Sequence, residues 1–282
     1  MSNNLNGNIS RSTSDSFDQF SRGFFYGDGL FESIRVFDGI VPFIHLHWER
    51  LEKGMRLLGF NIPSDWSGDF FRNEILKITS GNARVKISVW RSPGGLYHPT
   101  DQTPNFLITA NPLDSNCFKW LDDGLNIGQC TSVKLPIDTL SGLKVLGGTR
   151  YVMAAIEAHA KGFDDVMLSN TDGHVCETSS NNIFWIKKGV LYVPLPKDGH
   201  VLGIFQNHFT AILQAEGIEM VAKSTTFAAL QEADEVFLTN AIHGIRWVRL
   251  LEGTVLKCEK TIMFFNLTVS HLNRILLQKT DV

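Results

Sequence analysis

The hydrophobic pattern of this chain changes repeatedly between the two-residue period of a strand and the longer period of a helix. Residues 84–91 (RVKISVWR) alternate like a strand with one buried face. Trp48, Leu51, Met55 and Leu58 recur at helical spacing, and Gly59 ends the run. These patterns predict an α/β (α+β) fold, and 282 residues are enough for two domains, each with its own core.

Tight turns and one aperiodic stretch suggest how the chain is divided. ESIRVF and IVPF look like a hairpin turned by Asp38-Gly39, and IFWI and VLYV like another turned at 187–189. Periodicity is lost over 116–128, which makes this stretch the expected interdomain connection. We expect a flexible N-terminus over 1–20, a small α/β domain over 21–115 and a larger domain over 129–282.

Composition and charge exclude several classes of function. The net charge is -3 and the basic residues are scattered, so we expect no nucleic-acid partner. No run of about 18 apolar residues occurs, so no membrane span is expected. The four cysteines, at 117, 130, 176 and 258, form no CxxC pair or disulfide framework. We therefore predict no metal site and a reducing, cytoplasmic location.

The common short motifs of nucleotide and hydrolase sites are absent, but separate segments occur in an informative order. Gly27-Asp28-Gly29 lacks the third glycine and the strand-turn-helix context of a dinucleotide loop. The ordered segments are YGDGLFESIRVFDG (26–39), HLHWERL (45–51), LSGLKVLGGTR (140–150), ETSSNNIF (177–184), LGI (202–204) and FLTNA (237–241). Together they resemble the class IV aminotransferases, which use pyridoxal 5'-phosphate (PLP), over residues 22–248.

This resemblance implies a fold and two principal site residues. It implies a two-domain class IV PLP-enzyme fold with the cofactor at the domain interface, in a homodimer. A single lysine is ordinarily a solvated surface charge. In the family, however, the lysine at the position of Lys144 forms a Schiff base with PLP and moves the proton at the substrate Cα. Glu177 matches the carboxylate that keeps the PLP ring nitrogen protonated. Asn182 is expected to support that loop or the ring hydroxyl.

The resemblance also implies a set of phosphate ligands. A glycine-led helix start over Gly203, Ile204 and Phe205 supplies backbone N–H donors, and Thr239, Asn240 and Ala241 are expected to supply a second set. Arg50 matches the family's phosphate-binding arginine in its HxxRL pattern. The family commonly continues this helix as Gly-Ile-Thr-Arg, whereas this chain has Phe205-Gln206, so a hydroxyl and a cation are missing.

Substrate contacts and the reaction itself stay open at this point. Tyr26, Arg35, Arg91 and Tyr97 are the candidate substrate residues, because a cation could meet a substrate carboxylate. The leading hypothesis is amino transfer between an amino acid and a 2-oxo acid. The GGLY and TNAI segments look more like aminodeoxychorismate lyases, which release pyruvate in 4-aminobenzoate and folate synthesis, but the arginine common in the lyase loop is not evident. A third hypothesis is a non-catalytic binding protein that retained the fold.

Overall fold

The computed structural model describes residues 3–10 and 17–278, which divide into two compact units. The first holds the described part of Met1–Cys117 together with Leu143–Gly147 and the described end of the chain from Ile275. The second holds Phe118–Gly142 and Gly148–Arg274. A single continuous domain over 129–282 was expected, but the segment 143–147 is grouped with the first unit.

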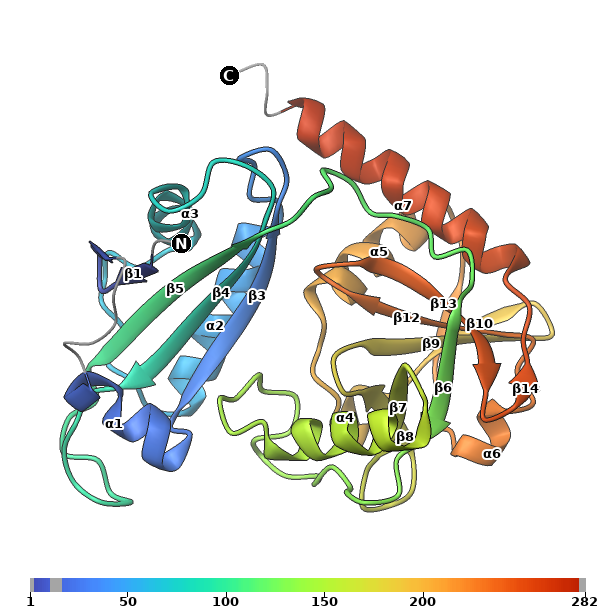
Figure 1. Ribbon diagram of the computed structural model, residues 1–282, viewed down its shortest axis with the longest axis horizontal. Helices are drawn as coiled ribbons and strands as arrows, with labels where there is room; N and C mark the ends of the chain where they lie inside the picture. The colour runs from blue at the N-terminus through green and yellow to red at the C-terminus, as the bar shows by residue number, and fades with distance from the viewer. Residues whose placement is uncertain (1–2, 11–16, 279–282) are drawn as a thin grey trace. The chain divides into compact units, whose positions relative to one another are not determined.

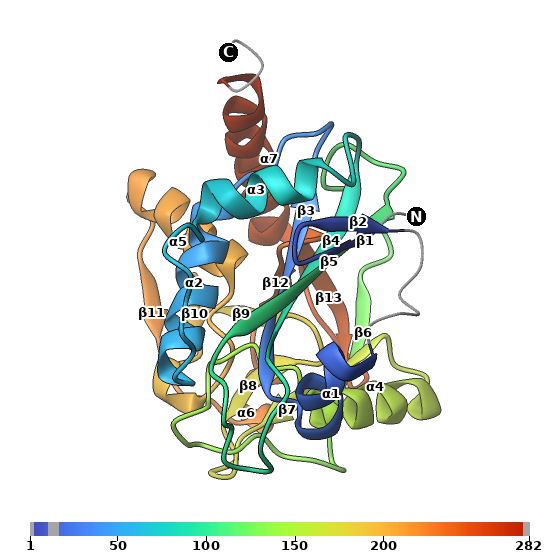
Figure 2. The same ribbon diagram turned by 90° about the vertical axis from the view of Figure 1, so that its left-hand side faces the viewer.

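The first unit is an antiparallel sheet with helices packed against it. Its strands lie in the order β2-β1-β5-β4-β3 (Figure 1). The strands are β1 (Asn3–Leu5), β2 (Asn8–Ser10), β3 (Gly29–Val36), β4 (Ala83–Arg91) and β5 (Pro104–Pro112), and the helices are α1 (Phe17–Tyr26), α2 (Ile44–Leu57) and α3 (Gly68–Leu76). Figure 2 shows α2 and α3 beside this sheet. Alternate residues of β4 are buried, as the two-residue period predicted, and they form one core with the apolar faces of α2 and α3.

The N-terminal residues differ from the expectation of a flexible segment. Residues 3–10 form the hairpin β1–β2, and β1 pairs with β5 along the edge of the sheet. Asn4 is fully buried and its Nδ2 donates to Glu74 Oε2 at 2.6 Å. Residues 1–2 and 11–16 lie outside the described residues. The strand over residues 3–5 was not expected because it pairs with residues about a hundred positions away, a contact that local composition does not reveal.

The expected strand IVPF is also absent. Ile40 pairs only with Phe37, which closes the turn at Asp38-Gly39. Phe43 then takes a left-handed conformation, with φ 58°, and begins α2. The backbone therefore turns into the helix where a second strand was predicted.

The second unit contains a ring of strands. Its sheet runs in the order β11-β10-β9-β12-β13-β6-β7-β8, and β8 returns to pair with β9. The ring strands are β6 (Leu125–Gln129), β7 (Asp165–Ser169), β8 (Val175–Thr178), β9 (Asn182–Lys187), β12 (Glu235–Asn240) and β13 (Gly244–Leu251). The pair that closes the ring is Glu177 with Asn182. Two residues predicted for the site thus face each other at this seam.

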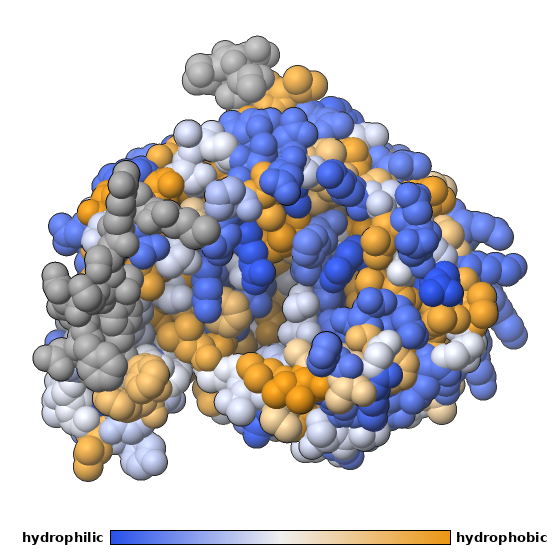
Figure 3. Space-filling view, in the orientation of Figure 1, coloured by the Kyte–Doolittle hydropathy of each residue, from blue (hydrophilic) through white to orange (hydrophobic). Residues whose placement is uncertain are grey.

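Helices and shorter strands complete the second unit. They are α4 (Thr149–Lys161), β10 (Val190–Val193), the 3-10 helix η1 (Pro196–Asp198), α5 (Ile204–Ala215), β11 (Met220–Ala222), α6 (Phe227–Leu230), β14 (Thr254–Val255) and most of α7 (Glu259–Gln278). Exposed apolar side chains lie over α4 on the face in Figure 3, where the helix carries Val152, Met153 and Ile156. Within the described part of the chain, every helix is too short or too polar to span a membrane.

Candidate functional site

Lys144 lies in a segment that the first unit holds by its backbone. The Lys144 carbonyl accepts from the Phe31 amide at 2.9 Å, and the Leu146 amide donates to the Gly29 carbonyl at 3.0 Å. Val145 forms a bridge with Leu30 and packs against the core of this unit. The Lys144 Nζ lies 4.4 Å from the centre of the Phe31 ring. The segment thus runs along the edge of β3, and this fixes the root of the lysine side chain.

Arg50 belongs to a buried charge network in the same unit. Its Nε and Nη2 donate to the two carboxylate oxygens of Glu32 at 2.7 and 2.5 Å. His47 Nδ1 lies 2.7 Å from Glu32 Oε2, and both side chains are almost fully buried. A paired guanidinium–carboxylate contact of this kind restricts orientation as well as position. The role of Arg50 as a phosphate ligand stays a prediction, but its guanidinium is held in one orientation.

The charge states in this network follow from its burial and its partners. Burial by itself raises the pKa of the Glu32 carboxyl, but the charge of Arg50 and the contact with His47 outweigh it and lower that pKa to about 2. Burial lowers the pKa of His47, against the opposing effect of Glu32. With its pKa lowered to about 2, Glu32 is ionised and balances the charge of Arg50. Neither Glu32 nor His47 had a predicted role, although both lie in the ordered segments.

Two of the candidate substrate residues come together in the structure. The rings of Tyr26 and Tyr97 are 5.6 Å apart, and the Arg22 guanidinium lies 4.9 Å from the centre of the Tyr26 ring. Tyr97 is 89% exposed and Tyr26 41% exposed, so both rings can be reached from solvent. Their role in substrate binding stays a prediction.

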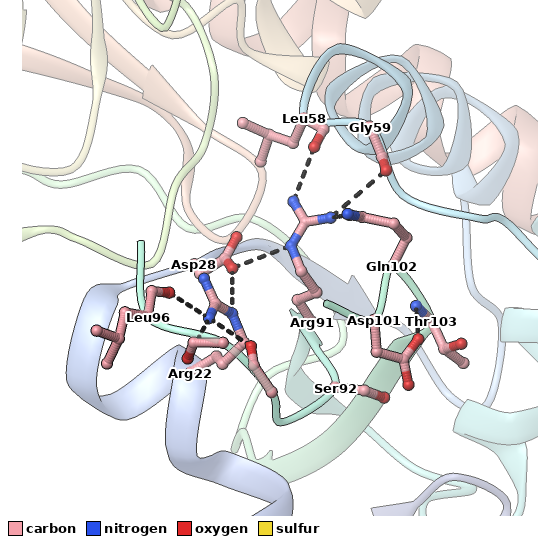
Figure 4. Close-up of polar contacts among 12 residues, drawn as sticks. Arg22, Asp28, Leu58, Gly59, Arg91, Ser92, Leu96, Asp101, Gln102 and Thr103 are labelled. Atoms are coloured by element: carbon pink, nitrogen blue, oxygen red, sulfur yellow. Dashed lines mark hydrogen bonds and ion pairs between the residues drawn. The ribbon is translucent and has the colours of Figure 1, made fainter. Parts of the chain in front are cut away.

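The Arg91 guanidinium donates hydrogen bonds to other groups of the protein (Figure 4). Its Nε donates to Asp28 Oδ2 at 3.0 Å and its Nη2 to the Leu58 carbonyl at 2.7 Å. Its Nη1 donates to Gln102 Oε1 and, at 3.4 Å, to the Gly59 carbonyl. All three nitrogens have acceptors within the first unit. The contacts therefore favour a structural role for Arg91 over the predicted contact with a substrate carboxylate.

Arg22 shares Asp28 with Arg91 and holds the following loop. Its Nε donates to Asp28 Oδ2 at 2.8 Å, and its Nη1 donates to the carbonyls of Gly94 and Leu96 at 2.9 and 2.7 Å (Figure 4). Asp28 thus joins two buried arginines, and one of them fixes the loop that carries Tyr97. In the sequence, Asp28 belongs to a rejected nucleotide motif and to the segment 26–39, but no role was predicted for it.

Arg35 is buried, and its guanidinium donates to backbone carbonyls of the protein. Its Nη2 donates to the carbonyls of Ser115 and Cys117 at 2.6 and 3.0 Å. Burial lowers the pKa of this guanidinium, and its carbon lies 4.9 Å from the centre of the Phe37 ring. These contacts favour anchoring of the chain where it leaves the first unit, and the predicted substrate role has no support in them.

In the second unit, the seam between β8 and β9 holds the Glu177 carboxylate. The Tyr151 hydroxyl donates to Glu177 Oε1 at 2.8 Å, and the Val201 amide donates to Oε2 at 3.2 Å. Glu177 is 4% exposed. A buried carboxylate with donors on both oxygens is kept in one orientation. No motif in the sequence pointed to Tyr151.

Asn182 connects this seam with the segment before α5. Its Nδ2 donates to the Val201 carbonyl at 2.6 Å. A Cβ at position 203 would collide with Asn182 Oδ1, so Gly203 is required for the close approach of this segment. Asn182 also pairs with Thr239 across β9 and β12. These contacts hold the segment before α5, and the expected support of the Glu177 loop or of the ring hydroxyl stays a prediction.

The start of α5 and the end of β12 present the groups suited to an anion. Gly203 is the N-cap of α5 without a side-chain cap, so the first N–H groups of the helix are open to a partner from outside the helix. Thr239 is fully buried, and its hydroxyl has no hydrogen-bond partner among the described residues. The Phe205 side chain packs edge-on against Phe118 at 5.5 Å, so this position contributes its backbone only. Gln206, where the family has arginine, is buried.

Asn240 shapes the turn that follows β12. Its Oδ1 accepts from the amides of Ile242 and His243 at 3.0 and 2.8 Å, and its Nδ2 donates to Asn181 Oδ1 at 2.7 Å. The side chain of Asn240 is therefore used within the turn that contains Ala241. The predicted phosphate contact at these two positions would come from backbone groups.

His200, next to Val201, leads to a prediction about acid stability. It is 1% exposed, and neither ring nitrogen has a partner among the described residues. Burial lowers its pKa to about 4, against the opposing charge of Asp198. The unfolded chain takes up this proton near pH 6.5 and the folded chain only near pH 4. The free energy of unfolding should therefore fall as pH decreases between these values, by up to about 1.4 kcal/mol per pH unit from this residue.

Urea unfolding at several values between about pH 7.5 and 4.5 measures this effect. The variant His200→Gln should show a shallower pH dependence than the unmodified chain, whereas His159→Gln, on the exposed side of α4, should not. If the free energy of unfolding depended equally on pH in all three proteins, His200 would not be the source of the effect.

Comparison with known proteins places the chain in a family. The model of the family "Amino-transferase class IV" matches residues 29–251. A Methanocaldococcus jannaschii protein provisionally named a branched-chain-amino-acid aminotransferase is 30% identical over 242 residues, 84% of this chain and 83% of that one. The aminodeoxychorismate lyase of Vibrio harveyi is also 30% identical, over 232 residues, 79% of this chain and 83% of that one.

The solved structures support the same conclusion for the fold. The branched-chain aminotransferase of Thermoproteus uzoniensis matches with a TM-score of 0.82 at 24% identity, covering 94% of this chain and 92% of that one. The family model extends from the start of β3 to the end of β13 and so includes Lys144 and Glu177. Enzymes of this family depend on PLP, and the chain belongs to the class IV aminotransferases.

Proposed function

We propose that this protein transfers an amino group between an amino acid and a 2-oxo acid, with PLP held by Lys144. The observation that carries the proposal is the fixed Glu177 carboxylate, with donors on both oxygens, in a chain that also holds Lys144 by its backbone. Burial of an ionised carboxylate costs free energy, so a carboxylate with no role beyond hydration would lie at the surface and not at a buried strand seam. Family membership supports the reaction class, and this geometry supports the choice of Lys144 and Glu177.

The residues present fit PLP. The uncapped start of α5 and the buried, unpartnered Thr239 hydroxyl suit a phosphate group, because both offer donors that the described residues do not use. When bound, the PLP ring accepts the electrons released as the substrate Cα–H bond breaks. We propose that Glu177 holds the proton on the ring nitrogen and that the Lys144 amine moves the proton at the substrate Cα. Arg50, oriented by Glu32, is the proposed cation for the phosphate.

A lyase acting on aminodeoxychorismate is the second candidate. It is supported by the V. harveyi lyase, whose identity to this chain equals that of the archaeal aminotransferase-like protein. The loop after β4 argues against it. Residues 92–97 (SPGGLY) carry no lysine or arginine, and the neighbouring Arg91 and Arg22 are bound to Asp28 and to carbonyls. Residues 92–97 offer no lysine or arginine to a dicarboxylate substrate, so we favour transamination.

Single-turnover experiments distinguish the two reactions. For an aminotransferase, single amino acids in the L or D form, without a 2-oxo acid, should change the cofactor absorbance in proportion to the enzyme. One equivalent of 2-oxo acid should be released, and adding a second 2-oxo acid should reverse the change. Catalytic release of pyruvate and 4-aminobenzoate from aminodeoxychorismate, with unchanged absorbance, would establish the lyase instead. Binding of PLP without either reaction would favour the non-catalytic hypothesis.

We also propose that the protein acts as a homodimer in the cytoplasm. The exposed aromatic and apolar side chains Phe24, Phe25, Leu96 and Tyr97 of the first unit support association with a second copy. All four cysteines are free thiols, in keeping with a reducing compartment. Sedimentation velocity of the purified protein tests the dimer, and a monomer at micromolar concentration would contradict it.

A further inference from the structure

Tyr151 connects helix α4 to the carboxylate at the seam of the strand ring. Its hydroxyl donates to Glu177 Oε1 at 2.8 Å, and this bond joins α4 to β8. The buried face of α4 continues with Ala154 and Ala158, which pack with Cys176 in one apolar cluster. Tyr151 lies on the same face and is partly buried against that cluster. The packing of the helix therefore determines where this hydroxyl points.

The Tyr151 hydroxyl keeps its proton and therefore remains a hydrogen-bond donor. Burial, and after it the negative charge of Glu177, raise the pKa of Tyr151 well above its ordinary value. The phenol therefore stays protonated under any condition in which the chain functions. The second oxygen of Glu177 is held independently by the Val201 amide, whose own carbonyl accepts from Asn182. The carboxylate thus has one donor from a helix and one from the loop before α5.

We infer that Tyr151 is a positioning residue, whose hydroxyl orients the Glu177 carboxylate for its contact with the PLP ring nitrogen. The inference rests on the proposed function of Glu177. The Tyr151 hydroxyl binds one carboxylate oxygen from α4 and the Val201 amide binds the other from the loop before α5. Together these two bonds restrict rotation about the last torsion of Glu177. Tyr151 itself needs no contact with substrate.

A double-mutant cycle tests the inference. The proteins are the unmodified chain, Tyr151→Phe, Glu177→Gln and the double variant, with PLP affinity measured by absorbance titration and proton removal by the isotope effect of a Cα-deuterated amino acid. Tyr151→Phe should weaken PLP binding and slow turnover by about 10-fold or more, the effect of one hydrogen bond to a charged group. It should also enlarge the isotope effect. In the Glu177→Gln background the same change should have little further effect.

The matched control is Tyr192→Phe, which removes a hydroxyl from a tyrosine of β10 that stacks on Trp185. It should leave both measurements unchanged. Additive effects of Tyr151→Phe and Glu177→Gln, or an unaltered isotope effect in Tyr151→Phe, would overturn the inference. If thermal unfolding shows that Tyr151→Phe does not fold, Tyr151→Met also lacks the hydroxyl and takes its place in the cycle.

Failure of the proposed function would be recognised separately. Borohydride reduction of the PLP-loaded chain, followed by peptide mass spectrometry, should find the pyridoxyl adduct on Lys144 in the unmodified chain and in Tyr151→Phe alike. An adduct elsewhere would contradict the function proposed for Lys144. An adduct on Lys144 with an additive cycle would contradict only the role of Tyr151.

Discussion

Replacement of Lys144 by alanine should abolish turnover, with a loss on the order of 10⁴-fold or more, and should leave the fold intact. The loss is large because one amine is assigned both the attachment of the cofactor and the movement of the Cα proton. The fold should survive because the segment is held by its backbone and by Leu143 and Val145, which pack on the core. Steady-state kinetics and circular dichroism measure the two effects, and reduction with borohydride should no longer fix PLP to the chain.

The first unit offers a matched control in Lys86. Its Nζ lies 4.7 Å from the centre of the same Phe31 ring that Lys144 approaches, but it projects from β4. Lys86→Ala removes a comparable cation and should keep most of the activity. If Lys86→Ala were as inactive as Lys144→Ala, the charge near Phe31 would matter and not the amine of Lys144. Turnover retained by Lys144→Ala would remove the lysine from the mechanism.

Glu177→Gln should slow turnover by on the order of 10²-fold or more, the second largest effect that we expect. A neutral amide cannot hold a proton on the ring nitrogen, and an electrostatic contribution of this kind is typically a few kcal/mol. The amide has nearly the volume of the carboxylate, so packing at the seam between β8 and β9 should be preserved. Rapid-mixing kinetics with a Cα-deuterated amino acid should place the loss in the step that removes the proton.

Glu235→Gln is the corresponding control for a buried carboxylate in the same unit. Its oxygens accept from the amides of Lys260 and Thr261, each at 2.8 Å, at the start of α7. This substitution should lower the thermal unfolding temperature and change turnover little. A loss of activity in Glu235→Gln similar to that in Glu177→Gln would mean that any disturbed carboxylate slows the enzyme. Unchanged turnover in Glu177→Gln would exclude it from the reaction.

Periodic segments of the sequence were predicted correctly as elements. The helix expected around Leu51 is confirmed as α2, and the strand expected over 84–91 is confirmed as β4. Both have a regular apolar face, and that pattern is local. The expected strand after Asp38 was wrong because Phe43 adopts a left-handed conformation. The strand β1 was not expected because it pairs with a distant strand.

The family and the fold class could be predicted because the motifs that carry them are short contiguous stretches. Lys144 and Glu177 each lie in such a stretch, so the pattern of residues along the chain is enough to name both. The side chains that surround them could not be named in this way. Glu32 binds Arg50 from 18 residues away, Tyr151 binds Glu177 from 26, and Asp28 binds Arg91 from 63.

The sequence by itself therefore determined the family, the cofactor and the two residues expected to do the chemistry. Only the tertiary structure decided which side chains orient them and which predicted residues are engaged in other contacts. From the sequence, Arg91 and Arg35 were plausible substrate ligands. In the structure their guanidinium groups donate to acceptors of the protein itself, among them the Leu58 and Ser115 carbonyls. The physical reason is that a buried polar side chain binds the hydrogen-bond donors and acceptors that the folded chain brings next to it. Those groups come from distant parts of the sequence.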